Sequence, residues 1–209
     1  MNDVYKLPEL SEVTPLVLIT GFLGAGKTTL LRELLIAIRG AELESDVILN
    51  DYADANLDSA TLEELATSIE PLTAVCACCE GFDFLLEMAV KSADSDSDLL
   101  FIELNGTADP VPIVEAFALL EEKMKRHPRW QICVINPQLF GSREGYADIE
   151  NLQLQTASHV YFSHTDEGSA SEEVIAKIRA VNPEVSILTN TELKEMVVSA
   201  LSLNPEPRF

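Results

Sequence analysis

The sequence predicts an α/β fold in which a mostly parallel sheet of about seven strands is sandwiched between helices. Short apolar segments rich in β-branched residues alternate with longer segments whose apolar residues recur at helical spacing, a pattern typical of a parallel sheet covered on both faces. A glycine-rich loop joins the first such strand to the first such helix. The chain has 209 residues, 47% of them hydrophobic, so it is long enough to bury one full core.

Each element follows from its local pattern. The first strand is predicted at residues 16–20, a continuous apolar run of the kind found in buried parallel strands. The first helix is predicted at residues 28–39, where leucines recur on one face and Gly40 supplies a stop. The further strands are predicted at residues 46–49, 69–73, 99–104, 131–135, 159–163 and 185–188. The further helices are predicted at residues 60–66, 82–92, 112–125, 151–157, 171–181 and 191–201.

Composition bounds the class of protein. The formal net charge is −21, from 35 acidic and 14 basic residues, which argues against a broad surface for nucleic acid or for an anionic membrane. No segment is apolar for long enough to span a membrane, and the N-terminus has no signal layout, so a cytoplasmic protein is expected. We expect residues 1–14 to be an N-terminal extension and residues 15–209 a single domain.

The glycine-rich loop predicts a nucleoside phosphate site. It reads Gly21-Phe22-Leu23-Gly24-Ala25-Gly26-Lys27-Thr28-Thr29 and fits the pattern G-x-x-x-x-G-K-[ST] between a strand and a helix. Its glycines let successive N–H groups face phosphate oxygens at the positive end of the helix dipole. Lys27 is predicted to reach the β- and γ-phosphates, and the Thr28 hydroxyl to ligate Mg²⁺. The alternative is a glycine-rich turn before an ordinary helix. The loop residues that we expect to contact the nucleotide are Gly21, Gly24, Ala25, Gly26, Lys27, Thr28 and Thr29.

A carboxylate at the end of another strand is the second candidate. The apolar run at residues 99–102 ends in Glu103, before a turn that contains Gly106. A buried acid without a partner is costly, and Mg²⁺ would satisfy it, so Glu103 is predicted to hold the metal with Thr28. The alternative is a strand-end glutamate exposed to water. These features predict a P-loop nucleoside triphosphatase.

Three of the four cysteines crowd into four positions as Cys76-Ala77-Cys78-Cys79. This spacing favours metal or redox chemistry over a disulfide framework in a cytosolic chain. Three thiolates with an open fourth position suit a soft metal ion that is handed on. The alternatives are a redox site and a cluster of small residues in a core turn. Cys133 lies in a predicted strand, where it is interpreted as a small core hydrophobe.

These motifs, in this order, resemble those of the CobW-type metallochaperone GTPases, relatives of the urease and hydrogenase nickel-insertion GTPases. The phosphate loop, the C-x-C-C run and the E-x-x-G element from Glu103 to Pro110 all match. Residues 50–58, Asn-Asp-Tyr-Ala-Asp-Ala-Asn-Leu-Asp, resemble the family's switch for the γ-phosphate. The resemblance runs from Pro15 to about Leu188.

The resemblance implies a GTPase that binds GTP or GDP with Mg²⁺. It further implies that hydrolysis is coupled to transfer of Zn²⁺, or another soft divalent metal, from the C-x-C-C site to a client metalloprotein of unknown identity. Catalysis would use Lys27, Thr28 and Glu103, with Asp51 or Asp54 orienting metal or water. A homodimer is expected by analogy.

The base-recognition segment departs from the family's Asn-Lys-x-Asp, because it reads Ser163-His164-Thr165-Asp166. Asp166 is predicted to accept hydrogen bonds from guanine, and His164 to stack on the base. The alternative for Asp166 is a surface acid that opens a turn. The family's switch glycines are replaced by Ala53 and Asn56, and its usual C-terminal domain is not matched, which favours an isolated or diverged GTP-binding domain.

Two other functions stay open. One is a nucleotide- and metal-binding module with little or no hydrolysis, which the altered base segment favours. The other is an ATP-using P-loop enzyme such as a small kinase, which the retained Asp166 and the lack of an obvious acceptor site count against. The hydrolysis rate and the preference between GTP and ATP separate these three functions.

Overall fold

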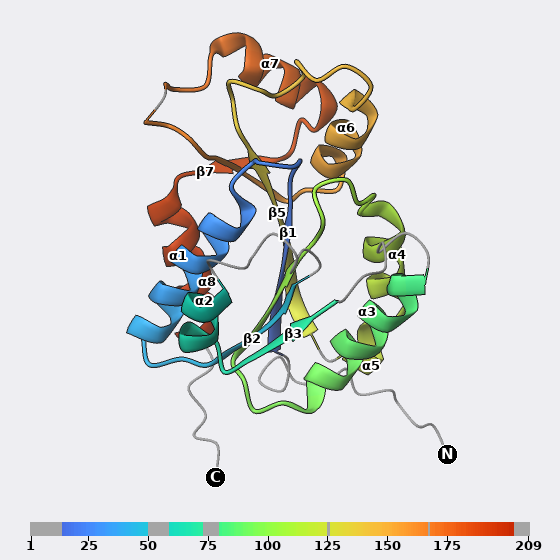
Figure 1. Cartoon of the computed structure of the whole chain (residues 1–209), viewed down its shortest axis with the longest axis vertical. Helices are drawn as coiled ribbons and strands as arrows, with labels where there is room; N and C mark the ends of the chain where they lie inside the picture. Colours follow the sequence, from blue (N-terminus) through green and yellow to red (C-terminus); the bar gives the residue numbers. More distant parts are fainter. Residues whose placement is uncertain (1–13, 50–58, 73–79, 125, 167, 203–209) are drawn as a thin grey trace, which may run out of the picture.

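A seven-stranded parallel sheet forms the centre of the protein (Figure 1). The computed structural model describes residues 14–49, 59–72, 80–124, 126–166 and 168–202. The strand order is β3-β2-β4-β1-β5-β6-β7, and every adjacent pair is parallel. The strands are β1 (Thr14–Thr20), β2 (Ser45–Leu49), β3 (Ser68–Pro71), β4 (Leu99–Glu103), β5 (Arg126–Ile135), β6 (His159–Phe162) and β7 (Ser186–Leu188).

Helices cover both faces of this sheet (Figure 1). One face carries α1 (Lys27–Gly40), α2 (Ser59–Leu65) and α8 (Asn190–Ser202). The other face carries α3 (Glu80–Lys91), α4 (Val111–Leu119) and α5 (Glu121–Met124) at one end, and α6 (Ala147–Gln155) and α7 (Glu172–Val181) at the other. A short 3-10 helix at Ser92–Asp94 follows α3.

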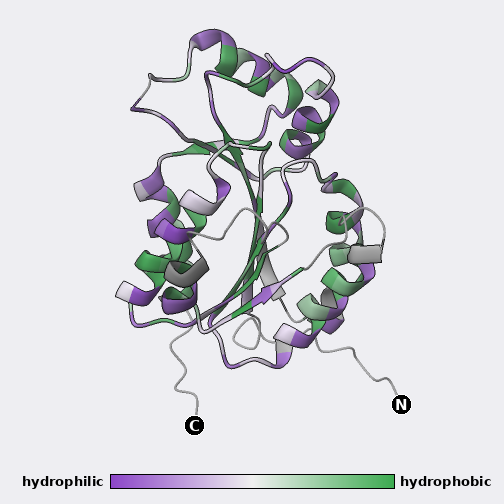
Figure 2. Ribbon diagram, in the orientation of Figure 1, coloured by the Kyte–Doolittle hydropathy of each residue, from purple (hydrophilic) through white to green (hydrophobic). Residues whose placement is uncertain are grey.

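The core follows the alternation of side chains along the strands. On β1, Val17 and Ile19 pack against the α1 face, whereas Leu16 and Leu18 pack against the α3 and α4 face. Hydrophobic residues line the strands and the inward sides of the helices, and hydrophilic residues lie on the outer sides (Figure 2). Both faces of the central strands are therefore buried, as a continuous apolar run predicts.

The predicted fold class is confirmed, and one predicted element is wrong. All seven strands occur within two residues of their predicted starts, except that β5 begins five residues earlier, at Arg126. The single helix predicted at residues 112–125 is two helices, α4 and α5, separated at Leu120, whose φ and ψ are −99° and 9°. The break leaves Leu119 exposed while Met124 becomes fully buried against the sheet. Burial of one side chain outweighs continuity of the helix there.

The carboxyl ends of the strands meet at one edge of the sheet, where ligands of open α/β sheets bind. The loops after β1 and β4 lie side by side at this edge, because Ile19 is the partner of Glu103 in the parallel register. The loop after β5 lies on the other side of β1, since Thr20 is the partner of Cys133. Within the described residues no helix is both long and apolar enough to cross a membrane.

Candidate functional site

The phosphate loop is built on glycines whose backbone or surroundings exclude a side chain. Gly26 caps α1 in the left-handed conformation, with φ 89° and ψ 26°, and no side chain caps the helix there. Gly21 has φ 138°, and a Cβ at this position would lie 2.3 Å from the Val134 carbonyl oxygen. The loop closes on itself where the Ala25 N–H donates to the Phe22 carbonyl at 3.0 Å. The loop thus leads directly into the start of α1, and the positive end of a helix dipole favours an anion there.

The predicted magnesium ligands lie in contact. The Thr28 hydroxyl, in the first turn of α1, donates to Glu103 Oε1 at 2.8 Å. Glu103 ends β4 and is only 3% exposed, so the alternative of a water-exposed glutamate is wrong. Lys27 is 6% exposed, and its Nζ donates to the Phe22 carbonyl at 3.4 Å across the loop. Residues 75 positions apart in sequence are brought together because β1 and β4 are neighbours.

This donor set fits a magnesium ion. A hydroxyl and a carboxylate supply hard oxygen ligands, which Mg²⁺ prefers, and Mg²⁺ in nucleotide sites takes its remaining ligands from phosphates and water. Thr28 and Glu103 are the residues that would hold it. Lys27 beside them would supply positive charge to the same phosphates.

The turn after Glu103 lies against the phosphate loop, which the sequence did not predict. A Cβ on Gly106 would be 2.4 Å from the Leu23 backbone N and 2.8 Å from its Cα. Asn105 Oδ1 stabilises the turn by accepting from the Thr107 N–H at 2.9 Å. The only sequence signal was the glycine itself, since close backbone approach is one of the reasons for a glycine in a turn.

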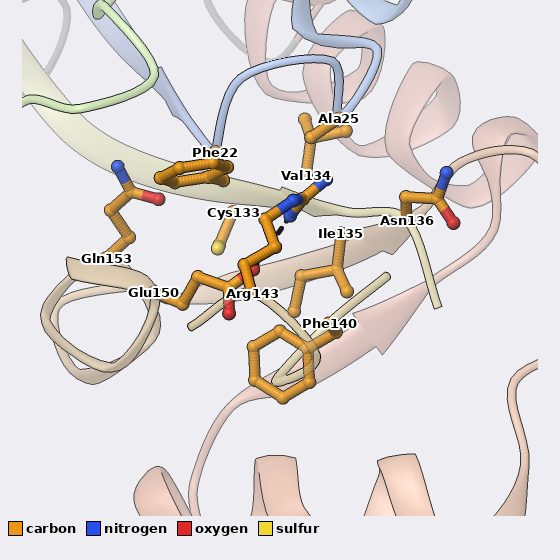
Figure 3. Close-up of a pocket in the computed structure, with 10 residues that line it drawn as sticks. All are labelled: Phe22, Ala25, Cys133, Val134, Ile135, Asn136, Phe140, Arg143, Glu150 and Gln153. Atoms are coloured by element: carbon orange, nitrogen blue, oxygen red, sulfur yellow. Dashed lines mark hydrogen bonds and ion pairs between the residues drawn. The ribbon is translucent and has the colours of Figure 1, made fainter. Parts of the chain in front are cut away.

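A second feature that the sequence did not predict is a group of side chains that packs against the phosphate loop (Figure 3). Arg143, in the segment after β5, lies 4.6 Å above the Phe22 ring and donates to the Leu23 carbonyl at 3.4 Å. Its guanidinium is held by Glu150 of α6 at 2.8 Å, and the Glu150 side chain is 5% exposed. Tyr146 completes the cluster, with its ring centroid 4.9 Å from that of Phe22. The cavity between these residues measures about 10 Å³, room for about one water molecule.

The Cys133 thiol lies beside that cluster, and its burial determines its pKa. Cys133 lines the same small cavity (Figure 3) and is 2% exposed. Burial raises the pKa of the Cys133 thiol to about 12, because a charged thiolate is unfavourable in an apolar setting. The interpretation of Cys133 as a core residue is confirmed.

The predicted base-recognition segment adjoins the phosphate loop. A Cβ on Gly26 would lie 3.3 Å from Ser163 Cβ and 3.6 Å from His164 Cε1. Ser163 is buried, and His164 adopts a left-handed φ of 53° with its Nδ1 2.8 Å from Ser163 Oγ. Asp166 is exposed. Whether Asp166 and His164 bind guanine stays a prediction.

A cavity of about 350 Å³ opens beyond this segment, at the carboxyl ends of β6 and β7. Thr165 lines it from the base-recognition segment, and residues 189–191 line it from the loop after β7. The sequence did not single out this second loop. Its position next to Thr165 makes it part of the candidate site.

The remaining predicted site residues, Asp51, Cys76, Cys78 and Cys79, lie outside the described residues. In the part of the chain that the structure describes, no group of three or more His, Cys, Asp or Glu side chains is placed to hold a metal ion. The C-x-C-C and switch predictions therefore stay predictions.

Comparison with known proteins decides the family. Residues 15–189 match the family described as CobW/HypB/UreG, nucleotide-binding domain. The chain belongs to this family. Its match to the zinc chaperone YjiA of Escherichia coli is 30% identical over 181 residues, covering 83% of this chain and 56% of that protein. Its match to the zinc chaperone CobW of Pseudomonas aeruginosa is 35% identical over 116 residues, covering 49% of this chain and 30% of that protein.

Solved structures give the same fold for this CobW/HypB/UreG domain. The hydrogenase maturation factor HypB of Archaeoglobus fulgidus superposes with a TM-score of 0.64 at 17% identity, covering 91% of each chain. The Zn(II)-bound YjiA GTPase of E. coli superposes with a TM-score of 0.60 at 23% identity, covering 85% of this chain and 57% of that one. The chain thus spans about half of YjiA and about a third of the Pseudomonas CobW protein. The phosphate loop lies within residues 15–189, which match the family.

Proposed function

We propose that this domain binds and hydrolyses GTP and couples its nucleotide state to the binding and transfer of zinc. Nucleotide binding is supported chiefly by the contact between Thr28 and the buried Glu103. This contact lies directly beside the glycine-rich start of α1, which no side chain caps. Membership of a nucleotide-binding family supports it. The zinc half is supported by relatives described as zinc chaperones and as a zinc-regulated GTPase metalloprotein activator.

In this proposal each residue of the site has its own role in binding or hydrolysing the triphosphate. The loop amides at the start of α1 and the Lys27 ammonium neutralise charge that develops on the phosphates. Thr28 and Glu103 hold Mg²⁺, which supplies further charge neutralisation when bound. Asp51 orients the attacking water or the metal. His164 and Asp166 recognise the guanine by stacking and by hydrogen bonds, respectively.

Zinc is the cargo in this proposal. The thiolates of Cys76, Cys78 and Cys79 bind it, and an open fourth position lets a client metalloprotein take it over. Residues 50–58 couple the two sites, because a switch ordered by the γ-phosphate changes its arrangement after hydrolysis. Release of zinc to the client follows that change.

The test measures zinc binding and GTP hydrolysis in the same preparations. The protein is compared with Lys27→Ala and with a variant in which Cys76, Cys78 and Cys79 are serine. We expect one tightly bound zinc that the triple variant loses, and Mg²⁺-dependent hydrolysis that Lys27→Ala loses. Unchanged zinc stoichiometry in the triple variant would reject the C-x-C-C site, and unchanged hydrolysis in Lys27→Ala would reject the phosphate loop.

A second candidate is a nucleotide- and metal-binding module with little hydrolysis. The observation that favours it is Ser163-His164 in place of the family's Asn-Lys beside Gly26. Single-turnover hydrolysis separates the two proposals: zinc and GTP binding without measurable phosphate release would favour the module.

A further inference from the structure

Arg143 makes two different contacts with the phosphate loop. Its Cζ lies 4.6 Å from the centroid of the Phe22 ring (Figure 3), and its Nη2 donates to the Leu23 carbonyl oxygen at 3.4 Å. A guanidinium is a rigid, planar group whose face can stack on a ring while its edge donates hydrogen bonds. One side chain therefore contacts two consecutive residues of the loop, one through its ring and the next through its backbone.

The guanidinium is itself held by a buried carboxylate. Glu150 of α6, whose side chain is 5% exposed, accepts from Arg143 Nη1 at 2.8 Å through Oε1. Its Oε2 accepts from the Gly141 N–H at 3.0 Å. The segment that carries Arg143 turns at two glycines in the left-handed region, Gly141 with φ 72° and Gly145 with φ 80°. Both carboxylate oxygens thus hold this segment, and the network gives the guanidinium one orientation.

The residue under the guanidinium is the one on which the loop closes. The Phe22 carbonyl oxygen accepts from the Ala25 N–H at 3.0 Å and from Lys27 Nζ at 3.4 Å. The Phe22 ring also packs against Tyr146, the residue directly before α6, at 4.9 Å between centroids. Backbone N–H groups of a phosphate loop bind the α- and β-phosphates, so their positions depend on how firmly the loop is closed.

We propose that Arg143 is a positioning residue that holds the phosphate loop in the conformation that binds the α- and β-phosphates. The inference rests on the proposed nucleotide function and adds to it a residue that lies outside the loop. Arg143 acts through Phe22 and Leu23 and contacts no phosphate. Without the guanidinium the loop populates other conformations, and a ligand that needs one of them binds more weakly in proportion to its population.

The experiment compares the protein with Arg143→Lys, which keeps a cation for Glu150 and removes the planar group that contacts Phe22 and Leu23 together. The matched control is Arg179→Lys. Arg179 of α7 also donates to two backbone carbonyls, but they belong to Pro183 and Val185 in the segment that follows α7. Calorimetry gives the dissociation constant of GDP with Mg²⁺ and with EDTA, and urea denaturation of each variant gives the free energy of unfolding.

We expect Arg143→Lys to weaken GDP binding about three- to tenfold, the effect of losing one hydrogen bond from a charged donor and part of the stacking. The factor is the same with Mg²⁺ and with EDTA, because the guanidinium acts on the loop and not on the predicted metal ligands. Arg179→Lys leaves the dissociation constant within about twofold of the wild type. A purely structural role for Arg143 would lower the free energy of unfolding in both variants and leave GDP binding unchanged in both.

A second variant tests the route through the ring. Phe22→Leu keeps an apolar side chain and removes the aromatic face, so we expect it to weaken GDP binding as well. If Arg143 acts through Phe22, the double variant weakens binding by less than the product of the two single effects. A full product of the two effects would contradict that route.

The two possible failures are distinguishable. If the wild-type protein binds no GDP, the proposed function fails and the role of Arg143 fails with it. If the wild type binds GDP and Arg143→Lys binds it equally well, the role assigned to Arg143 is wrong while the nucleotide site stands. The same conclusion follows if the weakening appears only with Mg²⁺ or is equally large in Arg179→Lys.

Discussion

Replacing Gly106 by alanine tests whether the turn after Glu103 lies against the phosphate loop. The φ of Gly106 is not positive, so its backbone conformation is open to any residue. On backbone entropy alone, Gly→Ala at a compatible site stabilises a protein by about 0.4–1 kcal/mol. Any loss of stability must therefore come from the space that the new methyl group needs.

The structure sets the size of that loss. The alanine Cβ would be 2.4 Å from the Leu23 N and 2.8 Å from its Cα and Cδ2, about 1 Å short of ordinary contact. Two backbone segments must separate to admit it. Overpacking of this kind costs roughly 1–3 kcal/mol, so we expect a net destabilisation of about 1–2 kcal/mol after the entropic gain.

The assay is urea denaturation followed by far-UV circular dichroism, which gives the free energy of unfolding. Gly40→Ala is the matched control, because a Cβ at the end of α1 meets nothing within 4 Å. We expect the control to be neutral or stabilised by up to about 1 kcal/mol. If Gly106→Ala proved as stable as Gly40→Ala, the close approach of the turn to Leu23 would be refuted.

Three further predictions concern a buried ion pair, a partly exposed ion pair and a buried thiol. Arg143→Ala removes the guanidinium that pairs with the buried Glu150 carboxylate. We therefore expect a loss of about 3 kcal/mol in the free energy of unfolding. A loss below about 0.5 kcal/mol would contradict a buried pair. The hydrogen bond from Lys194 lowers the pKa of the Glu33 carboxyl below its ordinary value of 4.5. The pair therefore stabilises the fold above about pH 4.5, and this stabilisation disappears as the pH falls further. Because the pair is partly exposed, Lys194→Met should lower the free energy of unfolding by about 0.2–1 kcal/mol at pH 7 and should not change it at pH 2. Because burial raises the pKa of Cys133 to about 12, iodoacetamide at pH 8 should leave it unmodified in the native protein and alkylate it after unfolding, as read by peptide mass spectrometry.

The sequence predicted those parts of the fold whose causes are local. The apolar run from Leu16 to Ile19 has few alternatives to a buried strand, and the leucines of α1 repeat at a helical period. The phosphate loop was predicted for the same reason, because its glycines, Lys27 and Thr28 are consecutive. Glu103 needed only the additional rule that carboxyl ends of parallel strands share an edge.

The contacts that the sequence missed join residues far apart along the chain. Arg143 reaches a carbonyl 120 positions away, and Gln153 reaches one 47 positions away. Neither residue belongs to a pattern with a period or a motif, and an arginine or glutamine in a polar segment is ordinarily solvated. The break at Leu120 was missed because helix propensity does not reveal which side chain gains most from burial.

The central claim is a GTP site organised by magnesium, and calorimetric titration with GTP and with ATP tests it most directly. Each nucleotide is added to the protein with Mg²⁺ and with EDTA, and the series is repeated with Thr28→Val, which keeps the shape of the side chain and removes the hydroxyl that contacts Glu103. The account predicts tighter binding of GTP than of ATP, weakened by EDTA, and loss of that magnesium dependence in Thr28→Val. Equal binding of both nucleotides would contradict guanine recognition by His164 and Asp166, and binding that is indifferent to Mg²⁺ would contradict the site itself.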